Sequence, residues 1–252
     1  MFITFEGGDG AGKTTQIELL KAALEKEGRS VVVTREPGGN AVAEKIRELL
    51  LDRASVMEDM TEAYLYAAAR AEHVRAVILP ALARGQVVLC DRFIDSSVAY
   101  QGYGRQIGAE RVEALNCEAV DGCMPERTYL LTLSEQDAAQ RVKNRGEADR
   151  IESAGEAFAR RVQEGFLRIA AEHPERVVVI DAGRPAEEIA RDIAGRFNGI
   201  YGDTFILPEG YVPASGAKIM SLAEPTKKMS KSDTNVNAFI LMTDDKDAIV
   251  RK

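Results

Sequence analysis

The segment from Gly7 to Thr14, with the sequence Gly-Gly-Asp-Gly-Ala-Gly-Lys-Thr, constrains the fold more than any other part of the chain. It fits the pattern G-x-x-x-x-G-K-[ST] of loops that hold the phosphates of a nucleotide. Residues 1–5 before it have the apolar character of a buried strand, and an amphipathic helix opens at Thr15. A chance cluster of glycines at a strand–turn–helix junction is the alternative, but the Lys-Thr pair at this offset favours a phosphate loop.

Each residue type in this loop has a physical task. Glycines let successive backbone N–H groups point inward at phosphate oxygens, and the following helix adds its positive N-terminal end. Lys13 supplies a point charge for the outer phosphates, and the Thr14 hydroxyl supplies a ligand for Mg2+. The residues predicted to bind ATP are Gly7, Gly8, Asp9, Gly10, Ala11, Gly12, Lys13, Thr14 and Thr15.

Composition places the chain among soluble globular proteins and excludes two classes. Of the 252 residues, 45% are hydrophobic and 29% are charged, and no stretch is apolar for long enough to span a membrane. The net charge of −7 argues against a general nucleic-acid-binding surface. Cys90, Cys117 and Cys123 have no metal-binding or CxxC spacing, which is typical of reduced thiols. We therefore expect a cytoplasmic protein with no leader segment.

Residues 1–196 alternate between strand and helix. Strands are predicted at residues 1–5, 31–34, 86–91, 128–133 and 176–181, and helices at residues 15–27, 42–51, 61–83, 109–120, 155–171 and 186–196. Such alternation predicts an α/β fold of the P-loop NTPase type, a five-stranded parallel sheet with helices on both faces. Ligands of such sheets bind at the carboxyl ends of the strands.

Charged side chains follow the strands at that edge. Arg35 follows the second strand, and Asp91 and Arg92 follow the third, where a carboxylate can hold Mg2+ through water. A basic, glycine-broken segment at residues 141–150 follows the fourth strand. Each feature alone could be a solvated surface group, but together they indicate phosphoryl transfer to an acceptor that already carries a phosphate.

Five motifs, taken in order, resemble the thymidylate kinase family over residues 2–196. They are Phe5-Glu6-Gly7, Thr34-Arg35-Glu36-Pro37-Gly38-Gly39, residues 66–73 (Tyr-Ala-Ala-Ala-Arg-Ala-Glu-His), residues 91–105 from Asp-Arg-Phe to Tyr-Gln-Gly-Tyr-Gly-Arg, and residues 145–152 (Arg-Gly-Glu-Ala-Asp-Arg-Ile-Glu). The resemblance implies ATP- and Mg2+-dependent phosphorylation of dTMP to dTDP by a homodimer. Two alternatives remain open. The acceptor is another pyrimidine monophosphate, or the protein binds nucleotides without enzymatic activity.

The resemblance also implies an acceptor site. Arg35 and Arg92 would hold the phosphate of dTMP, and Arg70 would reach a thymine carbonyl. Tyr66 stands where the family usually stacks Phe on the base, so its hydroxyl is a departure. The positions implied for dTMP binding are Asp9, Arg35, Tyr66, Arg70, Arg92, Ser97 and Tyr100.

The family stabilises transfer either with a basic residue inside the phosphate loop or with arginines in a lid. Residues 9–11 contain no basic side chain, whereas residues 141–150 contain three arginines, so the chain resembles the lid-arginine type common in bacteria. Thr14 and Asp91 are the implied metal ligands. The residues with an implied catalytic role are Lys13, Asp91, Arg92, Arg141, Arg145 and Arg150.

The remainder of the chain has a different character. Residues 228–232 read Lys-Met-Ser-Lys-Ser, and residues 191–252 resemble tryptophanyl-tRNA synthetase, in which this loop neutralises ATP phosphates. Seven Lys and Arg balance seven Asp and Glu over residues 200–252, which does not favour free-standing tRNA binding. We expect a domain at residues 1–196 and, at 197–252, an irregular appendage that is not an independent domain. A synthetase-related ATP- or tRNA-binding module is the alternative, expected to be inactive without the first half of the synthetase site.

Overall fold

The computed structural model describes residues 1–134, 137, 150–202 and 204–205. The chain divides into two units, Met1–Leu207 and Pro208–Lys252. The second unit, which contains the Lys-Met-Ser-Lys-Ser segment, lies outside the described residues, as do Arg141 and Arg145.

Five parallel strands form one sheet in the order β2-β3-β1-β4-β5, which confirms the α/β fold expected from the sequence. The strands are β1 (Phe2–Glu6), β2 (Val31–Arg35), β3 (Val87–Asp91), β4 (Arg127–Thr132) and β5 (Val177–Asp181). Side chains of β1 alternate between the faces: Ile3 and Phe5 join one apolar cluster, and Phe2 joins the other. The sheet is therefore buried on both sides.

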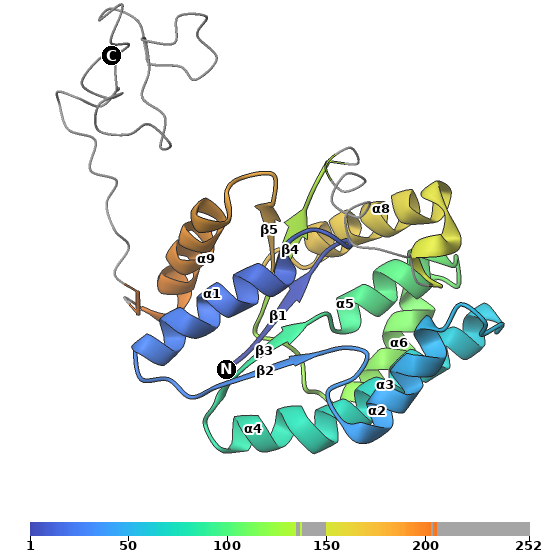
Figure 1. Cartoon of the computed structure of the whole chain (residues 1–252), viewed down its shortest axis with the longest axis horizontal. Coiled ribbons are helices and arrows are strands. Elements are labelled where there is room, and N and C mark those ends of the chain that lie inside the picture. Colours follow the sequence, from blue (N-terminus) through green and yellow to red (C-terminus); the bar gives the residue numbers. More distant parts are fainter. Residues whose placement is uncertain (135–136, 138–149, 203, 206–252) are drawn as a thin grey trace, which may run out of the picture. The chain divides into compact units, whose positions relative to one another are not determined.

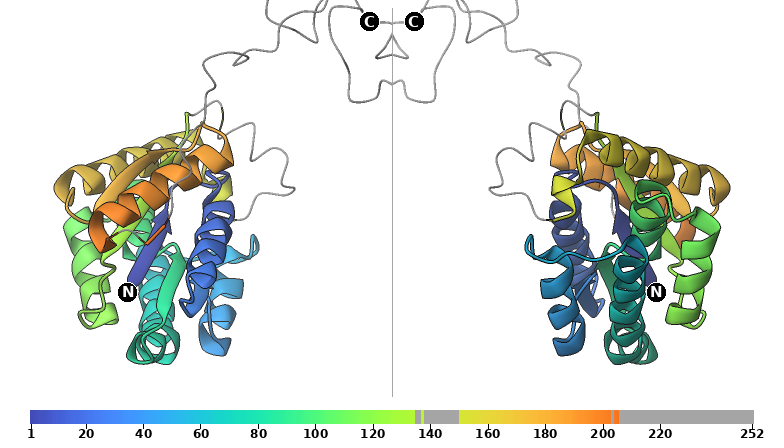
Figure 2. Two further views of the ribbon diagram at one scale, coloured as in Figure 1. Left: turned by 90° about the vertical axis from the view of Figure 1, so that its left-hand side faces the viewer. Right: turned by 90° about the vertical axis from the view of Figure 1, so that its right-hand side faces the viewer.

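Helices cover both faces of the sheet (Figures 1 and 2). On one face lie α1 (Lys13–Lys26) and α9 (Ala186–Tyr201), whose Ile17 and Ile193 pack in the same cluster. The other elements are α2 (Ala41–Leu51), α3 (Asp59–His73), η1 (Val74–Ile78), α4 (Leu79–Ala83), α5 (Ile94–Ser97), η2 (Val98–Gly104), α6 (Ala109–Val120), η3 (Glu152–Ala154) and α8 (Glu156–Glu172). Of these, η1, α4, α5, η2, α6 and α8 contribute buried residues to the cluster on the opposite face.

The strand register brings the predicted strand ends together. Asp91 of β3 pairs with Phe5 of β1 on one side and with Arg35 of β2 on the other. The loop after β1, the turn after β2 and the residue after β3 therefore open at the same edge of the sheet, which is where parallel sheets bind ligands.

Three elements differ from the sequence expectations. The helix predicted at residues 61–83 begins at Asp59 and consists of α3, a π-helical stretch (η1) and α4. Residues 94–104, for which no element is predicted, form α5 and η2. The last helix extends to Tyr201 because Phe197, 1% exposed, packs its ring 4.6 Å from that of Tyr201 and 5.0 Å from that of Phe205.

Candidate active site

The loop between β1 and α1 has the backbone that a phosphate cradle needs. Gly7 has a φ of +127°, and a Cβ there would lie 2.1 Å from the carbonyl oxygen of Leu131, so only glycine fits. Gly12 has a φ of +86° and stands immediately before the first residue of α1. The N-terminal end of α1 is thereby directed at the loop, as anion binding requires.

Lys13 lies over this loop. Its Nζ donates hydrogen bonds of 3.1 Å to the carbonyl oxygens of Gly7 and of Gly8, and the residue is 7% exposed. Burial, and then the positive charge of Arg92, lower the pKa of Lys13 to about 8. The ammonium group is thus held at the place where the outer phosphates of a nucleotide would bind in such a loop.

Thr14 and Asp91 fit the coordination of Mg2+. Thr14 Oγ1 donates to Asp91 Oδ2 at 3.4 Å, while Asp91 Oδ1 is buried and has no hydrogen-bond partner among the described residues. A hydroxyl and one carboxylate with an unpartnered oxygen fit a magnesium ion that takes its other ligands from phosphate and water.

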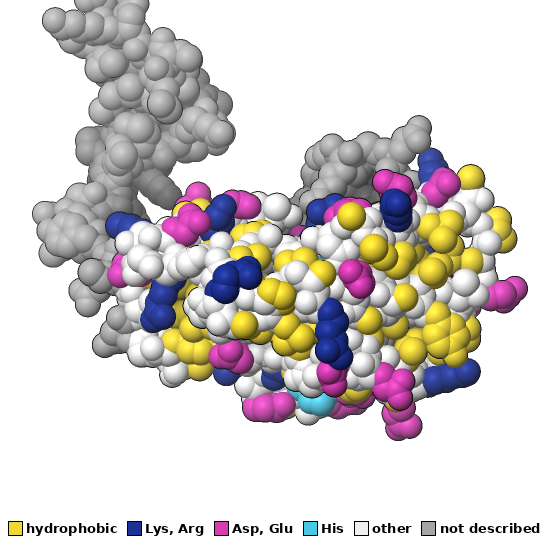
Figure 3. Space-filling view, turned by 90° about the horizontal axis from the view of Figure 1, so that it is seen from below, with side chains coloured by type: hydrophobic (Ala, Val, Ile, Leu, Met, Phe, Trp, Pro, Cys, Tyr) yellow, Lys and Arg dark blue, Asp and Glu magenta, His cyan; other side chains and the backbone are white. Residues whose placement is uncertain are grey.

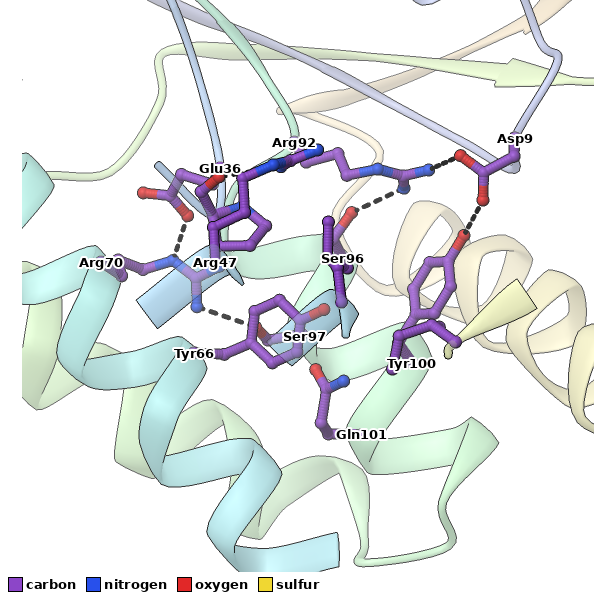
Figure 4. Close-up of a pocket in the computed structure, with 13 residues that line it drawn as sticks. Asp9, Glu36, Arg47, Tyr66, Arg70, Arg92, Ser96, Ser97, Tyr100 and Gln101 are labelled. Carbon is purple, nitrogen blue, oxygen red and sulfur yellow. Dashed lines mark hydrogen bonds and ion pairs between the residues drawn. The ribbon is translucent and has the colours of Figure 1, made fainter. Parts of the chain in front are cut away.

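Arg92 connects the phosphate loop to a neighbouring pocket. Its Nη1 donates to the carbonyl oxygen of Gly7 at 3.0 Å and to Ser96 Oγ at 3.1 Å, and its Nη2 donates to Asp9 Oδ1 at 2.8 Å. Tyr100 lies beneath the guanidinium, 5.2 Å from ring centroid to Cζ, and its hydroxyl donates to Asp9 Oδ2 at 3.5 Å. Asp9, Arg92 and Tyr100 therefore form one unit beside the loop (Figure 4).

The pocket encloses about 570 Å³ of empty space, part of which is open to solvent. Its walls come from the phosphate loop, the turn after β2, helices α2 and α3, and the segment from β3 to η2. The residues that line it are Asp9, Glu36, Pro37, Arg47, Leu51, Tyr66, Arg70, Arg92, Ser96, Ser97, Tyr100, Gln101 and Ile151. Of the seven positions that the resemblance assigns to dTMP, only Arg35 is not among them.

Arg70 is the largest fully buried side chain among the described residues. Its Nε donates to Glu36 Oε2 at 2.7 Å, its Nη1 to Ser97 Oγ at 2.9 Å and to Asn116 Oδ1, and its Nη2 to the carbonyl oxygen of Phe93 at 2.9 Å. These bonds use four of the five N–H groups of a guanidinium. The fifth, on Nη2, has no acceptor among the described residues, and the guanidinium borders the pocket.

Two arginines with implied roles lie elsewhere. Arg35 is half exposed and donates to Glu44 Oε2 at 2.9 Å. Arg150 Nε donates to the carbonyl oxygen of Leu50 at 2.7 Å. Its Nη2 lies 2.8 Å from Glu62 Oε2 and forms an ion pair whose angle does not meet that of a hydrogen bond. Both are thus engaged with carboxylates of α2 and α3, not with the phosphate loop.

The pocket also contains residues to which the sequence assigns no role. Arg47 of α2 donates to the carbonyl oxygen of Pro37 at 2.9 Å, and Gln101 of η2 donates to Glu62 Oε1 at 2.8 Å. Arg47 has no local pattern that marks it, because its place in the pocket depends on α2 packing beside the turn after β2. Gln101 lies within one of the motifs quoted above.

Glu6 supports the site from behind. Its Oε1 accepts from the backbone N–H of Phe93 at 2.7 Å, and its Oε2 accepts from Ser96 Oγ at 2.5 Å. Burial, and then the negative charge of Asp95, raise the pKa of Glu6 to about 8. Because Ser96 also binds Arg92, this buried carboxyl joins the end of β1 to the guanidinium in the pocket.

Comparison with known proteins identifies two parts of the chain. The thymidylate kinase family matches residues 5–193. A thymidylate kinase from Exiguobacterium sibiricum is 48% identical over 193 residues, covering 76% of this chain and 91% of the relative. One from Clavibacter michiganensis is 50% identical over 197 residues, covering 78% and 93%. The crystal structure of thymidylate kinase from Ehrlichia chaffeensis has a TM-score of 0.65 at 34% identity and covers 78% of this chain and 98% of that one.

The second match concerns the C-terminal part. The family of class I tRNA synthetases for tryptophan and tyrosine matches residues 185–252. This range overlaps the first by residues 185–193, which lie at the start of α9.

Proposed function

The chain belongs to the thymidylate kinase family, and we propose on this ground that it transfers the γ-phosphoryl group of ATP to dTMP, giving dTDP and ADP. One structural observation supports phosphoryl transfer independently of the family match. The pocket that would take the acceptor shares Asp9 with the phosphate loop that would take the donor. Two phosphorylated ligands bound there would meet at Asp9 and Arg92, which is the arrangement that direct transfer requires.

In this mechanism the protein positions charges and supplies no nucleophile. Lys13 turns its N–H groups from the carbonyl oxygens of Gly7 and Gly8 to the phosphates of ATP. Arg92 neutralises the acceptor phosphate from a position fixed by Asp9 and Ser96. Thr14 and Asp91 would hold Mg2+, which would offset the negative charge between the phosphates. The loop backbone binds without reorganising, because its glycines already have the required conformation.

We propose that the base of dTMP occupies the inner part of the pocket. Tyr66 supports this through its aromatic face and Arg70 through its one uncommitted N–H group, while Ser97 holds the guanidinium and Tyr100 closes the side next to Asp9. Arg35 lies one strand from Asp91 and would join the phosphate only after leaving Glu44.

The other predictions from the sequence remain part of the proposal. Arg141, Arg145 and Arg150 would stabilise transfer from a lid, and Arg150 would do so after leaving Glu62. We further propose a cytoplasmic homodimer with ATP and Mg2+ as cosubstrate and cofactor, and a kinase unit followed by a segment that does not activate amino acids. Within the described residues, no helix is both long and apolar enough to cross a membrane.

A coupled assay across nucleoside monophosphates, with ATP and Mg2+, tests the function. We expect dTMP to give the highest kcat/KM, and omission of Mg2+ to abolish turnover. A preference for dUMP or dCMP would overturn the assignment of the substrate. Tryptophan-dependent exchange of pyrophosphate into ATP would overturn the proposal that the C-terminal segment is inactive.

A further inference from the structure

The motifs at residues 34–39 and 66–73 are joined by a chain of hydrogen bonds that has no role in the proposed phosphoryl transfer. Thr34 Oγ1 lies 2.7 Å from His73 Nε2, and His73 Nδ1 lies 2.9 Å from Glu36 Oε1. Glu36 Oε2 in turn accepts from Arg70 Nε at 2.7 Å. We call Thr34, His73 and Glu36 the relay, because they connect strand β2 and the end of α3 to the guanidinium of Arg70.

Each bond has a definite direction when Glu36 is an ionised carboxylate and the ring of His73 is neutral. An ionised carboxylate only accepts, so Nδ1 of His73 carries the proton that it donates to Glu36. In the neutral ring, Nε2 is then an acceptor, and the hydroxyl of Thr34 donates to it. Each oxygen of Glu36 has its own donor, so the carboxylate cannot rotate without breaking a bond to His73 or to Arg70.

His73 and Glu36 are buried, whereas Thr34, at the outer end of the relay, is partly buried. The side chains of His73, Arg70 and Glu36 are 0%, 1% and 3% exposed. A Cβ on Gly39 would lie 2.6 Å from ring atoms of His73 and 2.7 Å from Thr34 Oγ1, so the glycine leaves room for the relay. A broken hydrogen bond between His73, Glu36 and Arg70 is costly, because these groups are buried away from water.

We propose that the relay is a positioning device for Arg70, which makes the pocket select a pyrimidine with a carbonyl rather than an amino group at its hydrogen-bonding edge. Arg70 borders the pocket, and four of its N–H groups are held by Glu36, Ser97, Asn116 and Phe93. In this proposal the remaining N–H group is the donor to the base. A carbonyl oxygen accepts from that donor, whereas an amino group opposes it. The inference rests on the proposed function, because it takes the ligand of the pocket to be a nucleotide base.

Thr34→Val tests the relay at the end farthest from the pocket. The change removes the hydroxyl, keeps the shape and suits a strand, so the fold is preserved. We expect the KM and the dissociation constant for dTMP to rise about 3- to 10-fold, the effect of one lost hydrogen bond that is partly buried. The preference for dTMP over dCMP should fall by the same factor, while the KM for ATP stays within twofold. Thr34→Ser, which retains the hydroxyl, should restore the wild-type values.

His73→Asn is a second variant, since its amide retains a donor near Nδ1 but cannot reach Thr34; it should resemble Thr34→Val. An unchanged dTMP-to-dCMP preference in both variants would overturn the relay, even if the melting temperature falls, because that result describes a purely structural role. Equilibrium titration of dTMP and dCMP measures the preference without turnover. A wild-type chain that binds with this preference but transfers no phosphate would overturn the proposed function and not the relay.

Discussion

Lys13 combines a proposed catalytic role with a cost to stability. Burial, and then Arg92, lower the pKa of Lys13 from 10.5 to about 8, so below about pH 8 the folded chain pays to keep a buried ammonium charged. We expect Lys13→Met, which keeps the length and removes the charge, to lower kcat/KM for ATP by about 10²-fold or more. At pH 7 its melting temperature should equal or exceed that of the wild type. Retained turnover, or a clear loss of thermal stability, would contradict this prediction.

The raised pKa of Glu6 makes the stability of the folded protein depend on pH. Folding raises the pKa of its carboxyl from 4.5 to about 8, so its contribution to stability is complete below pH 4.5 and is lost as the pH rises through about 8. Glu6→Gln remains neutral throughout. The melting temperature of this variant relative to wild type should therefore increase between pH 6 and pH 9 by at least about 3 °C, the effect of about 1 kcal/mol in a domain of this size. Glu18→Gln, at an exposed position of α1, is the control and should show no such change.

A site residue can be predicted from the sequence when it belongs to a contiguous motif, and not when only tertiary packing brings it to the site. Asp9, Arg92 and Tyr100 belong to contiguous motifs at strand ends, and the structure brings them together. Arg47 and the ion pair between Arg35 and Glu44 depend on how α2 packs against the turn after β2, which no local pattern encodes.

At the scale of elements, α8 and η2 pack through glycines. A Cβ on Gly165 of α8 would lie 2.6 Å from the ring of Tyr103 in η2, whereas a Cβ on Gly199 of α9 would meet nothing within 4 Å. Gly199→Ala should stabilise the protein by about 0.5–1 kcal/mol, the helix propensity gain. Gly165→Ala should instead destabilise it by about 1–3 kcal/mol, because overpacking outweighs that gain. Urea unfolding measures both, and equal signs for the two variants would contradict the packing argument.

The elements that periodicity predicts are those buried by apolar side chains. All five strands and α6 agree with the sequence to within a residue or two at each end. The segment 94–104 escapes prediction because its buried positions include Ser96, Ser97 and Gln101, which break the apolar pattern. Their polar groups are satisfied by Glu6, Arg70 and Glu62, residues remote in sequence. A helix of this kind can be recognised only once its partners are in place.

At the scale of the molecule, one face of the described surface mixes charges of both signs with scattered hydrophobic groups, and no single sign dominates it (Figure 3). The expectation, from the net charge of −7, that the chain has no general nucleic-acid-binding surface stays a prediction.

Helix α9 is where the two family matches overlap, and packing assigns it to the kinase unit. Its Ile189, Ile193 and Phe197 are buried in the cluster that covers one face of the sheet. Asn198 extends the same unit, because its Oδ1 accepts from the backbone N–H groups of Thr204 and Phe205 at 3.1 and 2.8 Å. The domain end expected at Arg196 would cut through these contacts.

Two shortened chains therefore differ in outcome. A chain ending at Leu207 should keep the kcat/KM for dTMP of the full chain and its cooperative unfolding, since it contains all the contacts of α9 within the described residues. A chain ending at Arg196 loses Phe197, whose removal from the core alone costs about 3–5 kcal/mol, together with the contacts of Tyr201 and Phe205. Thermal unfolding and the dTMP assay on the two chains decide the matter. Equal melting temperatures for the two chains would place the domain boundary at Arg196. Loss of activity in the chain ending at Leu207 would show that the kinase needs residues 208–252.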